Sequence, residues 1–281
     1  MKVIDPHIHL FSVSQGHYHW LKPENPPFWS EKATICRDVS EFELNTVKLA
    51  GYVHIEAGFD NARPWREANW LQSHSRLPVR IVGGINLTSN DFHTQLDALS
   101  VKPHVVGVRD ILDERAASLL RLPIVRHRLA VLANRGLLFE AQLSLTDTNA
   151  VAQLGRVLET SPALNVVINH GGFPPLSQEQ QSLQMQLWKN ALQRLSVYPH
   201  VSVKLSGWEM MSERPDWRAV SRIIAAALEY FGAERVMMAS NFPLLTFRMR
   251  YADYWQKVGE LVPQMHRNAL LHDNASRCYG F

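Results

Sequence analysis

Short runs of apolar and β-branched residues recur eight times along the chain and end in polar residues of catalytic type. Between these runs, apolar residues recur at helical spacing, for example over 62–75 and 116–135. The pattern therefore predicts that strands and helices alternate throughout. The predicted strands cover 2–5, 51–57, 79–86, 104–109, 137–143, 165–170, 201–206 and 235–240.

Eight such units in 281 residues predict an α/β fold with one (β/α)8 barrel, a fold that needs about 250 residues. The alternative is a doubly wound open sheet, but no Gly-x-Gly-x-x-Gly follows the first run. No linker or low-complexity tract divides the chain, so we expect a single domain over 1–281. A closed parallel barrel delivers the carboxyl ends of all its strands to one mouth, where active sites form.

Composition narrows the functional class. No apolar stretch is long enough to cross a bilayer, and no basic-then-apolar leader opens the chain, so we expect a cytoplasmic protein without membrane contact. Cys36 and Cys278 lack ligand-like spacing and are expected to be reduced, buried thiols. The net charge of +3 comes from scattered residues, which argues against nucleic acid. We expect a small-molecule substrate and a monomer or homodimer.

Side chains alternate between the two faces of a strand, and three predicted strands carry polar pairs at that spacing. The pairs are His54 with Glu56, Glu140 with Gln142, and Lys204 with Ser206. We expect these pairs to face the barrel interior and their apolar neighbours to face the helices. Each buried polar group without a partner costs about 1–3 kcal/mol, so such a set favours a functional site over a purely structural one.

Several motifs together resemble the amidohydrolase superfamily. They are Asp-Pro-His-Ile-His at 5–9, Gly-Val-Arg at 107–109, Asn-His-Gly-Gly at 169–172, Lys-Leu-Ser-Gly-Trp at 204–208, Ser-Asn-Phe-Pro at 240–243 and the closing segment 273–280. More narrowly, they are similar to the TIM-barrel branch that contains sugar lactonases and 2-pyrone-4,6-dicarboxylate lactonase. The resemblance covers essentially the whole chain.

The resemblance implies roles for individual residues. His7, His9 and His170 match histidines that bind a divalent metal, zinc above all, or hydrogen-bond a substrate carbonyl without metal. Arg109 matches an arginine that reaches carboxylate or hydroxyl groups of the substrate, a task that suits its planar fork of donors.

Asn241 departs from the family pattern, which most often has aspartate at this position. An amide does not titrate near working pH and cannot act as the general base. Two routes remain open: zinc held by the three histidines could supply hydroxide, or Glu56 or Glu140 could activate the water without metal. A third reading is that the protein has lost hydrolytic activity.

Aromatic residues in the loops indicate the substrate class. The long segment 10–37 carries several aromatic and proline residues, and we expect Trp20 from this segment and Trp208 to contact substrate. The remaining predicted substrate-binding residues are His54, Lys204 and Ser206. The sequence thus predicts a hydrolase that opens a small cyclic ester, a sugar-derived or carboxylated lactone. The alternatives are a metal-dependent decarboxylase of an aromatic or unsaturated acid and a non-catalytic ligand-binding relative.

Overall fold

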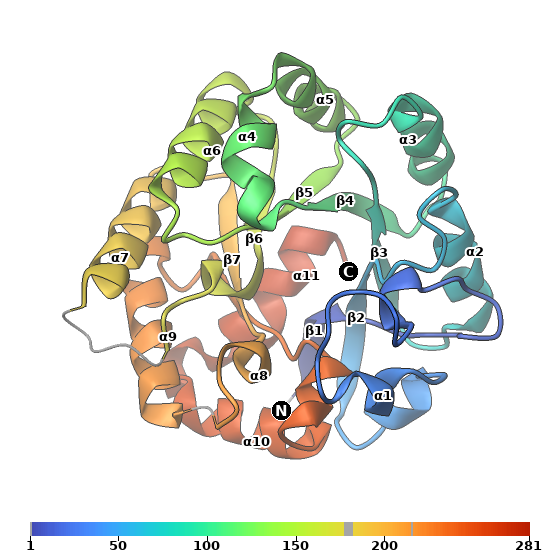
Figure 1. Ribbon diagram of the computed structural model, residues 1–281. Coiled ribbons are helices and arrows are strands. Elements are labelled where there is room, and N and C mark those ends of the chain that lie inside the picture. The colour runs from blue at the N-terminus through green and yellow to red at the C-terminus, as the bar shows by residue number, and fades with distance from the viewer. Residues whose placement is uncertain (1, 177–181, 215) are drawn as a thin grey trace.

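The computed structural model describes residues 2–176, 182–214 and 216–281. Eight parallel strands surround a central axis in the order of the chain, and helices surround the strands (Figure 1). This arrangement confirms the predicted (β/α)8 barrel. The strands are β1 (Val3–Ile8), β2 (Leu49–Ile55), β3 (Val79–Gly84), β4 (Val105–Ile111), β5 (Leu138–Gln142), β6 (Val166–Ile168), β7 (Val201–Leu205) and β8 (Val236–Met238).

The barrel closes where β1 meets the segment that follows β8. Ile8 and Phe242 form a parallel bridge there. The His9 N–H donates to the Phe242 carbonyl at 2.7 Å, and the Asn241 N–H donates to the His7 carbonyl at 3.0 Å. Residues predicted to act in catalysis therefore lie on the seam that completes the barrel.

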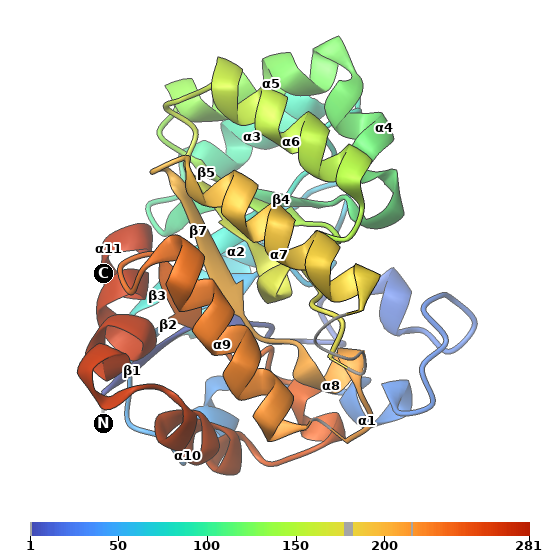
Figure 2. The ribbon, with the colours of Figure 1, turned by 90° about the vertical axis from the view of Figure 1, so that its left-hand side faces the viewer.

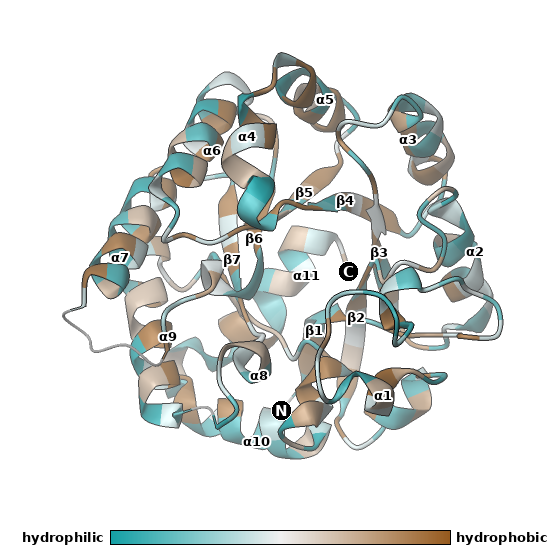
Figure 3. Ribbon diagram, viewed as in Figure 1, coloured by the Kyte–Doolittle hydropathy of each residue, from teal (hydrophilic) through white to brown (hydrophobic). Residues whose placement is uncertain are grey.

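The helices form an outer layer around the strands, as the view turned by 90° shows (Figure 2). Figure 3 shows hydrophilic and hydrophobic residues mixed along them, as expected for helices with one face on the barrel. The predicted helical segment 116–135 is split at Leu122, because Pro123 has no N–H to continue the first helix and begins the second. The helices are α1 (Lys32–Ile35), α2 (Trp65–His74), α3 (Phe92–Ser100), α4 (Ala116–Arg121), α5 (Pro123–Asn134), α6 (Thr148–Thr160), α7 (Leu183–Ser196), α8 (Trp208–Met211), α9 (Trp217–Phe231), α10 (Tyr251–Leu261) and α11 (Asn274–Tyr279).

The apolar core has two parts, one between strands and helices and one inside the barrel. Phe139 and Val203 belong to the outer part, as the alternation predicts for β5 and β7. The same prediction is wrong for β2, because Val53 lies in the inner part and His54 points outward. His54 can be buried there because helix α2 supplies Glu67, a polar partner that a strand pattern does not reveal.

Helix α11 lies across the end of the barrel opposite the mouth. Its Ala275 and Tyr279 join the inner apolar cluster, and Arg80, near the start of β3, donates to the carbonyl of Gly280 just after the helix. The barrel is thus closed at one end and open at the other. Among the described residues, no helix combines the length and apolar character that a membrane span requires. The expectation that both cysteines are buried is wrong, because Cys36 is exposed and Cys278 is half-buried.

Candidate active site

A cavity of about 730 Å³ lies at the mouth of the barrel. Its walls combine a polar floor with aromatic and proline residues of the loop between β1 and β2. The polar residues that line it include His9, Glu56, Arg109, Gln142, His170 and Asn241, and the apolar ones include Trp20, Pro26, Pro27, Trp29 and Phe173. With Gly207 after β7 included, residues from seven strands or strand ends therefore converge on one space of a size suited to a small molecule.

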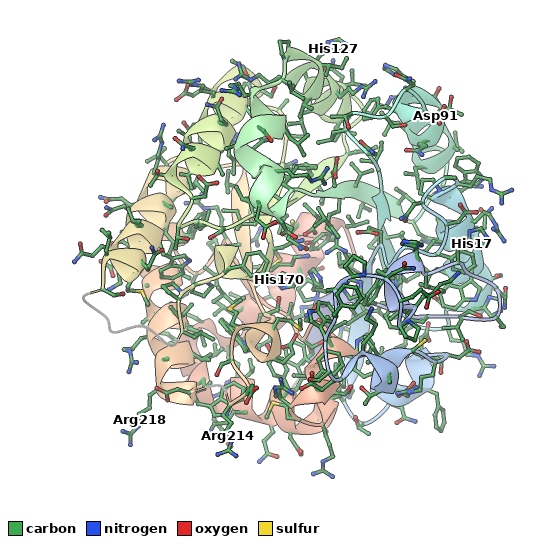
Figure 4. All side chains as sticks on the ribbon, in the orientation of Figure 1. His17, Asp91, His127, His170, Arg214 and Arg218 are labelled. Carbon is green, nitrogen blue, oxygen red and sulfur yellow. The ribbon has the colours of Figure 1, made fainter. Side chains whose placement is uncertain are left out.

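Three histidines meet beside this cavity. The ring centroid of His7 lies 5.0 Å from that of His9 and 4.6 Å from that of His170. Figure 4 shows His170 near the centre of the barrel view, whereas the labelled His17 and His127 lie toward the periphery. The structure thus brings together the histidine set that the sequence analysis singled out.

The hydrogen bonds of these rings determine which nitrogen can face a substrate. His9 Nδ1 lies 2.8 Å from the Ile55 carbonyl, so the proton sits on Nδ1 and Nε2 is an acceptor. His170 Nδ1 lies 2.9 Å from Ser206 Oγ, which can donate to it and leave an Nε2–H donor. Neither ring nitrogen of His7 has a hydrogen-bond partner in the described part of the chain.

Burial keeps these histidines neutral. It is the main cause that lowers the pKa of His7 and of His9 well below 6.5, with nearby cationic groups adding to the effect. Burial, together with Arg109 and Lys204, lowers the pKa of His170 to about 3. At neutral pH the cluster therefore offers neutral donors and acceptors to a ligand.

The backbone at the site adopts sparsely populated conformations. His170 has φ 52° and Asn241 has φ 61°, both in the left-handed region. Gly207 has φ 75°, and a Cβ built on it would lie 2.8 Å from His170 Nδ1. A glycine is therefore required at 207 for the His170 ring to occupy its position.

A buried carboxylate fixes the seam below the histidines. Asp5 accepts hydrogen bonds from the backbone N–H groups of His7 and Ser240, from Ser240 Oγ and from the Tyr251 hydroxyl. These bonds connect the first and last strands and hold the His7 backbone. Burial nevertheless raises the pKa of Asp5 to about 6.

The histidines have the donor chemistry for zinc, since neutral imidazoles with free nitrogens are its usual ligands. Their geometry does not fit a metal site. Within residues 2–176, 182–214 and 216–281, no three His, Cys, Asp or Glu side chains are grouped so that they could hold one ion.

Arg109 lines the cavity but is already paired. It donates through Nε to Glu56 Oε1 at 2.9 Å, through Nη2 to the Glu56 carbonyl at 2.9 Å and through Nη1 to Gln142 Oε1 at 3.0 Å. A further Nη2 contact to Glu56 Oε1 measures 2.7 Å. Because a guanidinium has five N–H donors, one Nη1 hydrogen remains for a ligand.

Glu140 and Lys204 lie inside the barrel and are not among the residues that line the cavity. Glu140 Oε2 lies 2.6 Å from Lys204 Nζ, and both side chains are fully buried. Tyr279 donates to Glu140 Oε1, and Lys204 donates to the Pro6 carbonyl. The structure places this pair as an internal brace that ties β5 and β7 to β1 and α11.

The remaining predicted substrate-binding residues occupy different places. Trp20 lines the cavity and donates through Nε1 to the Ala57 carbonyl at 2.7 Å. Ser206 is buried against His170, and Trp208 is buried with 1% of its surface exposed. His54 accepts from the Leu10 N–H and contacts Glu67 at 3.0 Å. The structure therefore brings Trp20 to the cavity, but not His54, Ser206 or Trp208.

A residue that the sequence analysis did not select lies behind Asn241. Glu209, in α8, accepts a hydrogen bond from Asn241 Nδ2 at 2.6 Å and is 4% exposed. Burial raises its pKa to about 7, against the lowering effects of Asn241 and Arg248. The sequence offered one signal for Glu209, which directly follows Trp208 at the end of the motif 204–208. It did not show where the Glu209 side chain points.

Comparisons with known proteins agree with this architecture. An L-fucono-1,5-lactonase of Burkholderia ambifaria is 24% identical over 256 residues, which cover 89% of this chain and 83% of that protein. The uncharacterized protein y4mH of Sinorhizobium fredii is 28% identical over 299 residues, covering 99% and 98%. A crystal structure of an amidohydrolase from Burkholderia multivorans with bound zinc shares the fold, with a TM-score of 0.80 at 20% identity over 100% of both chains.

The family model described as amidohydrolase matches residues 4–281. The match includes the histidine cluster, the paired Arg109 and both residues of the Asn241–Glu209 contact. The protein therefore belongs to the amidohydrolase family and is a hydrolase.

Proposed function

We propose that the protein hydrolyses an uncharged, polyhydroxylated lactone of the sugar-lactone type. The observation that carries this proposal is the charge of the cavity. Glu56 and Arg109 neutralise each other at 2.7 Å, and among the described residues the other charged ones that line the cavity are Asp113 and Glu114. A dicarboxylated lactone would bring further negative charge to this acidic lining, and like charges in contact cost several kcal/mol.

Hydrogen-bonding groups of the cavity suit the hydroxyl groups of a sugar lactone. Arg109 has one N–H to donate, His9 Nε2 can accept, and Trp20 with Trp29 forms an apolar wall. The L-fucono-1,5-lactonase among the relatives supports the same substrate class. Arg109 thus serves in this proposal as a donor to a hydroxyl group rather than as a partner for a carboxylate.

The reaction adds water to the lactone carbonyl and breaks the ring C–O bond. In this proposal His170 donates through Nε2–H to the carbonyl oxygen, on which negative charge develops as water attacks. The water oxygen becomes part of the new carboxyl group, and the ring oxygen leaves as a hydroxyl. Donors that are already positioned stabilise the developing charge without reorganisation.

A comparison of substrates tests the proposal. The specificity constant kcat/KM is measured for neutral six-carbon 1,5-lactones and for 2-pyrone-4,6-dicarboxylate, and an aromatic acid is assayed for decarboxylation. We expect the neutral lactones to be favoured at least tenfold, which corresponds to about 1.4 kcal/mol. A preference for the dicarboxylate, or release of carbon dioxide from the aromatic acid without hydrolysis of any lactone, would overturn it.

A further inference from the structure

Glu209 and Asn241 form a buried pair whose two side chains differ in their access to the cavity. Asn241 lines the cavity, whereas Glu209 lies behind it and does not. Asn241 Nδ2 donates to Glu209 Oε1 at 2.6 Å, so the amide is oriented with Oδ1 as the atom left for the cavity. No hydrogen bond to Oδ1 is found within the described residues.

The second oxygen of Glu209 gives an independent observation. Oε2 is buried, and in the part of the chain that the structure describes it has no hydrogen-bond partner. An ionised carboxylate with a lone, unsolvated oxygen is costly, whereas a protonated carboxyl needs fewer partners. The surroundings of Glu209 therefore suit a group that gains and loses a proton.

We infer that Glu209 acts through Asn241 as the proton acceptor of the reaction, in place of the carboxylate that the resemblance leads one to expect at position 241. The inference rests on the proposed lactone hydrolysis. Glu209 does not touch the substrate. It positions the Asn241 amide and receives the proton that this amide passes on.

The proton transfer balances in both directions. As the water oxygen bonds to the carbonyl carbon, a water proton moves to Asn241 Oδ1 and the Nδ2 proton moves to Glu209 Oε1. Asn241 is then an imidic acid, and Glu209 is neutral. When the tetrahedral intermediate collapses, the ring oxygen takes the proton from Oδ1 and Glu209 returns its proton to the amide nitrogen.

The groups around Glu209 allow this role at neutral pH. Burial raises the pKa of Glu209 to about 7, and general bases work best when their pKa lies near the working pH. Arg248 faces Glu209 from the turn after β8 and lowers the pKa, but less than burial raises it. Tyr254 of α10 also faces Glu209, and its own pKa lies well above 10, so it stays neutral.

The test uses an isosteric variant and a rearranged pair. Glu209→Gln keeps an oxygen that can accept from Asn241 Nδ2 but cannot take its proton. We expect kcat to fall by about 10²–10⁴ and the limb of the pH profile near pH 7 to disappear. The double variant Asn241→Asp with Glu209→Gln moves the carboxylate to the cavity and reverses the hydrogen bond, and we expect it to recover most of the lost rate.

Glu213→Gln, which alters an exposed glutamate just beyond α8, is the matched control and should keep the wild-type rate. Wild-type kcat and pH profile in Glu209→Gln would show that Glu209 only orients the amide and would overturn the inference. So would failure of the double variant to regain activity while its circular dichroism spectrum matches the wild type.

Failure of the proposed function is distinguishable from failure of this inference. The infrared band of the protonated Glu209 carboxyl is recorded at several pH values. It is identified in the difference spectrum between the wild type and Glu209→Gln. If no lactone is hydrolysed but this band titrates near pH 7, the substrate assignment is overturned while the titrating group is supported. If lactones are hydrolysed and the band shows no titration between pH 5 and about 9, the inference is overturned.

Discussion

Two buried glutamates of this barrel have opposite surroundings. Glu140 is 0% exposed, lies 2.6 Å from Lys204 Nζ and accepts a hydrogen bond from Tyr279. Glu209 is 4% exposed and faces the neutral amide of Asn241 at 2.6 Å. A cation in contact compensates the charge of the first, whereas the second has no cation in contact among the described residues. The comparison indicates that a buried carboxylate with a cation in contact suits a structural role, whereas the inferred proton transfer needs a carboxylate without such a cation.

The largest effect is expected from breaking the ion pair between Glu140 and Lys204. Lys204→Met removes the cation and leaves Glu140 buried without a charge partner, which should reduce the free energy of unfolding by about 3–5 kcal/mol. Urea unfolding at pH 7 measures the change. The double variant Lys204→Met with Glu140→Gln should regain most of the stability, and a single variant as stable as the wild type would contradict the role of the pair as a brace.

The next largest effect is expected from the loss of a hydrogen-bond donor at the cavity. In the proposed mechanism His170→Ala removes the Nε2–H donor to the developing oxyanion, so turnover should fall by about 10²–10³, or about 2.7–4 kcal/mol in the barrier. Steady-state kinetics with a neutral lactone measures the fall. His127→Ala, at an exposed histidine on the periphery, is the control. Wild-type turnover in His170→Ala would remove the histidine cluster from the mechanism.

A pH series of stability sharpens the contrast between the two glutamates. Burial raises the pKa of folded Glu209 from 4.5 to about 7, so the folded state binds more protons than the unfolded state between these values. This contribution to stability is complete below about pH 4.5 and is lost as the pH rises to about 7. Glu209→Gln cannot titrate. Its stability relative to the wild type should therefore rise over this window, by an amount on the order of 3 kcal/mol.

Urea unfolding of both proteins at several pH values gives this difference directly. Asp5, whose pKa burial raises to about 6, titrates in both proteins and cancels in the comparison. Glu140→Gln would not serve as the matched variant, because it would leave Lys204 without its partner. A relative stability that stays constant from pH 4 to about 8 would contradict the raised pKa.

The smallest expected effect concerns metal. Since the described residues group no three suitable ligands, we expect dialysis against a chelator to leave lactone hydrolysis unchanged. Elemental analysis and rates before and after dialysis provide the measurement. Loss of activity that zinc restores would show that the histidines rearrange around an ion.

The periodic features of the sequence predicted the fold well. Eight apolar runs separated by helical patterns specify the barrel because each strand and helix must bury a face of its own. The predicted limits were less accurate where tertiary contacts decide them. The first strand continues through Ile8 because the seam pairs it with the segment after β8, and a sequence pattern does not show that pairing.

Site residues were predictable where a polar side chain lies directly at the end of a predicted strand. His7, His9, His170 and Arg109 meet at the mouth for this reason, and their roles stay predictions. Side-chain partners that come from helices were not predictable, and both Glu67 beside His54 and Glu209 beside Asn241 belong to this class. Trp208 shows the same limit, because the position of a tryptophan after a strand does not tell whether it faces the cavity or the core.

The seam between β1 and the segment after β8 has a consequence for protein synthesis. His7 and Asn241 are joined by a backbone hydrogen bond, although they come from opposite ends of the barrel in the chain. During translation, the histidine pair emerges from the ribosome before strands β2 to β8, and its partner segment emerges after all of them. The active site therefore cannot assemble on a nascent chain before the eighth strand is released, and the appearance of activity marks the completion of the barrel.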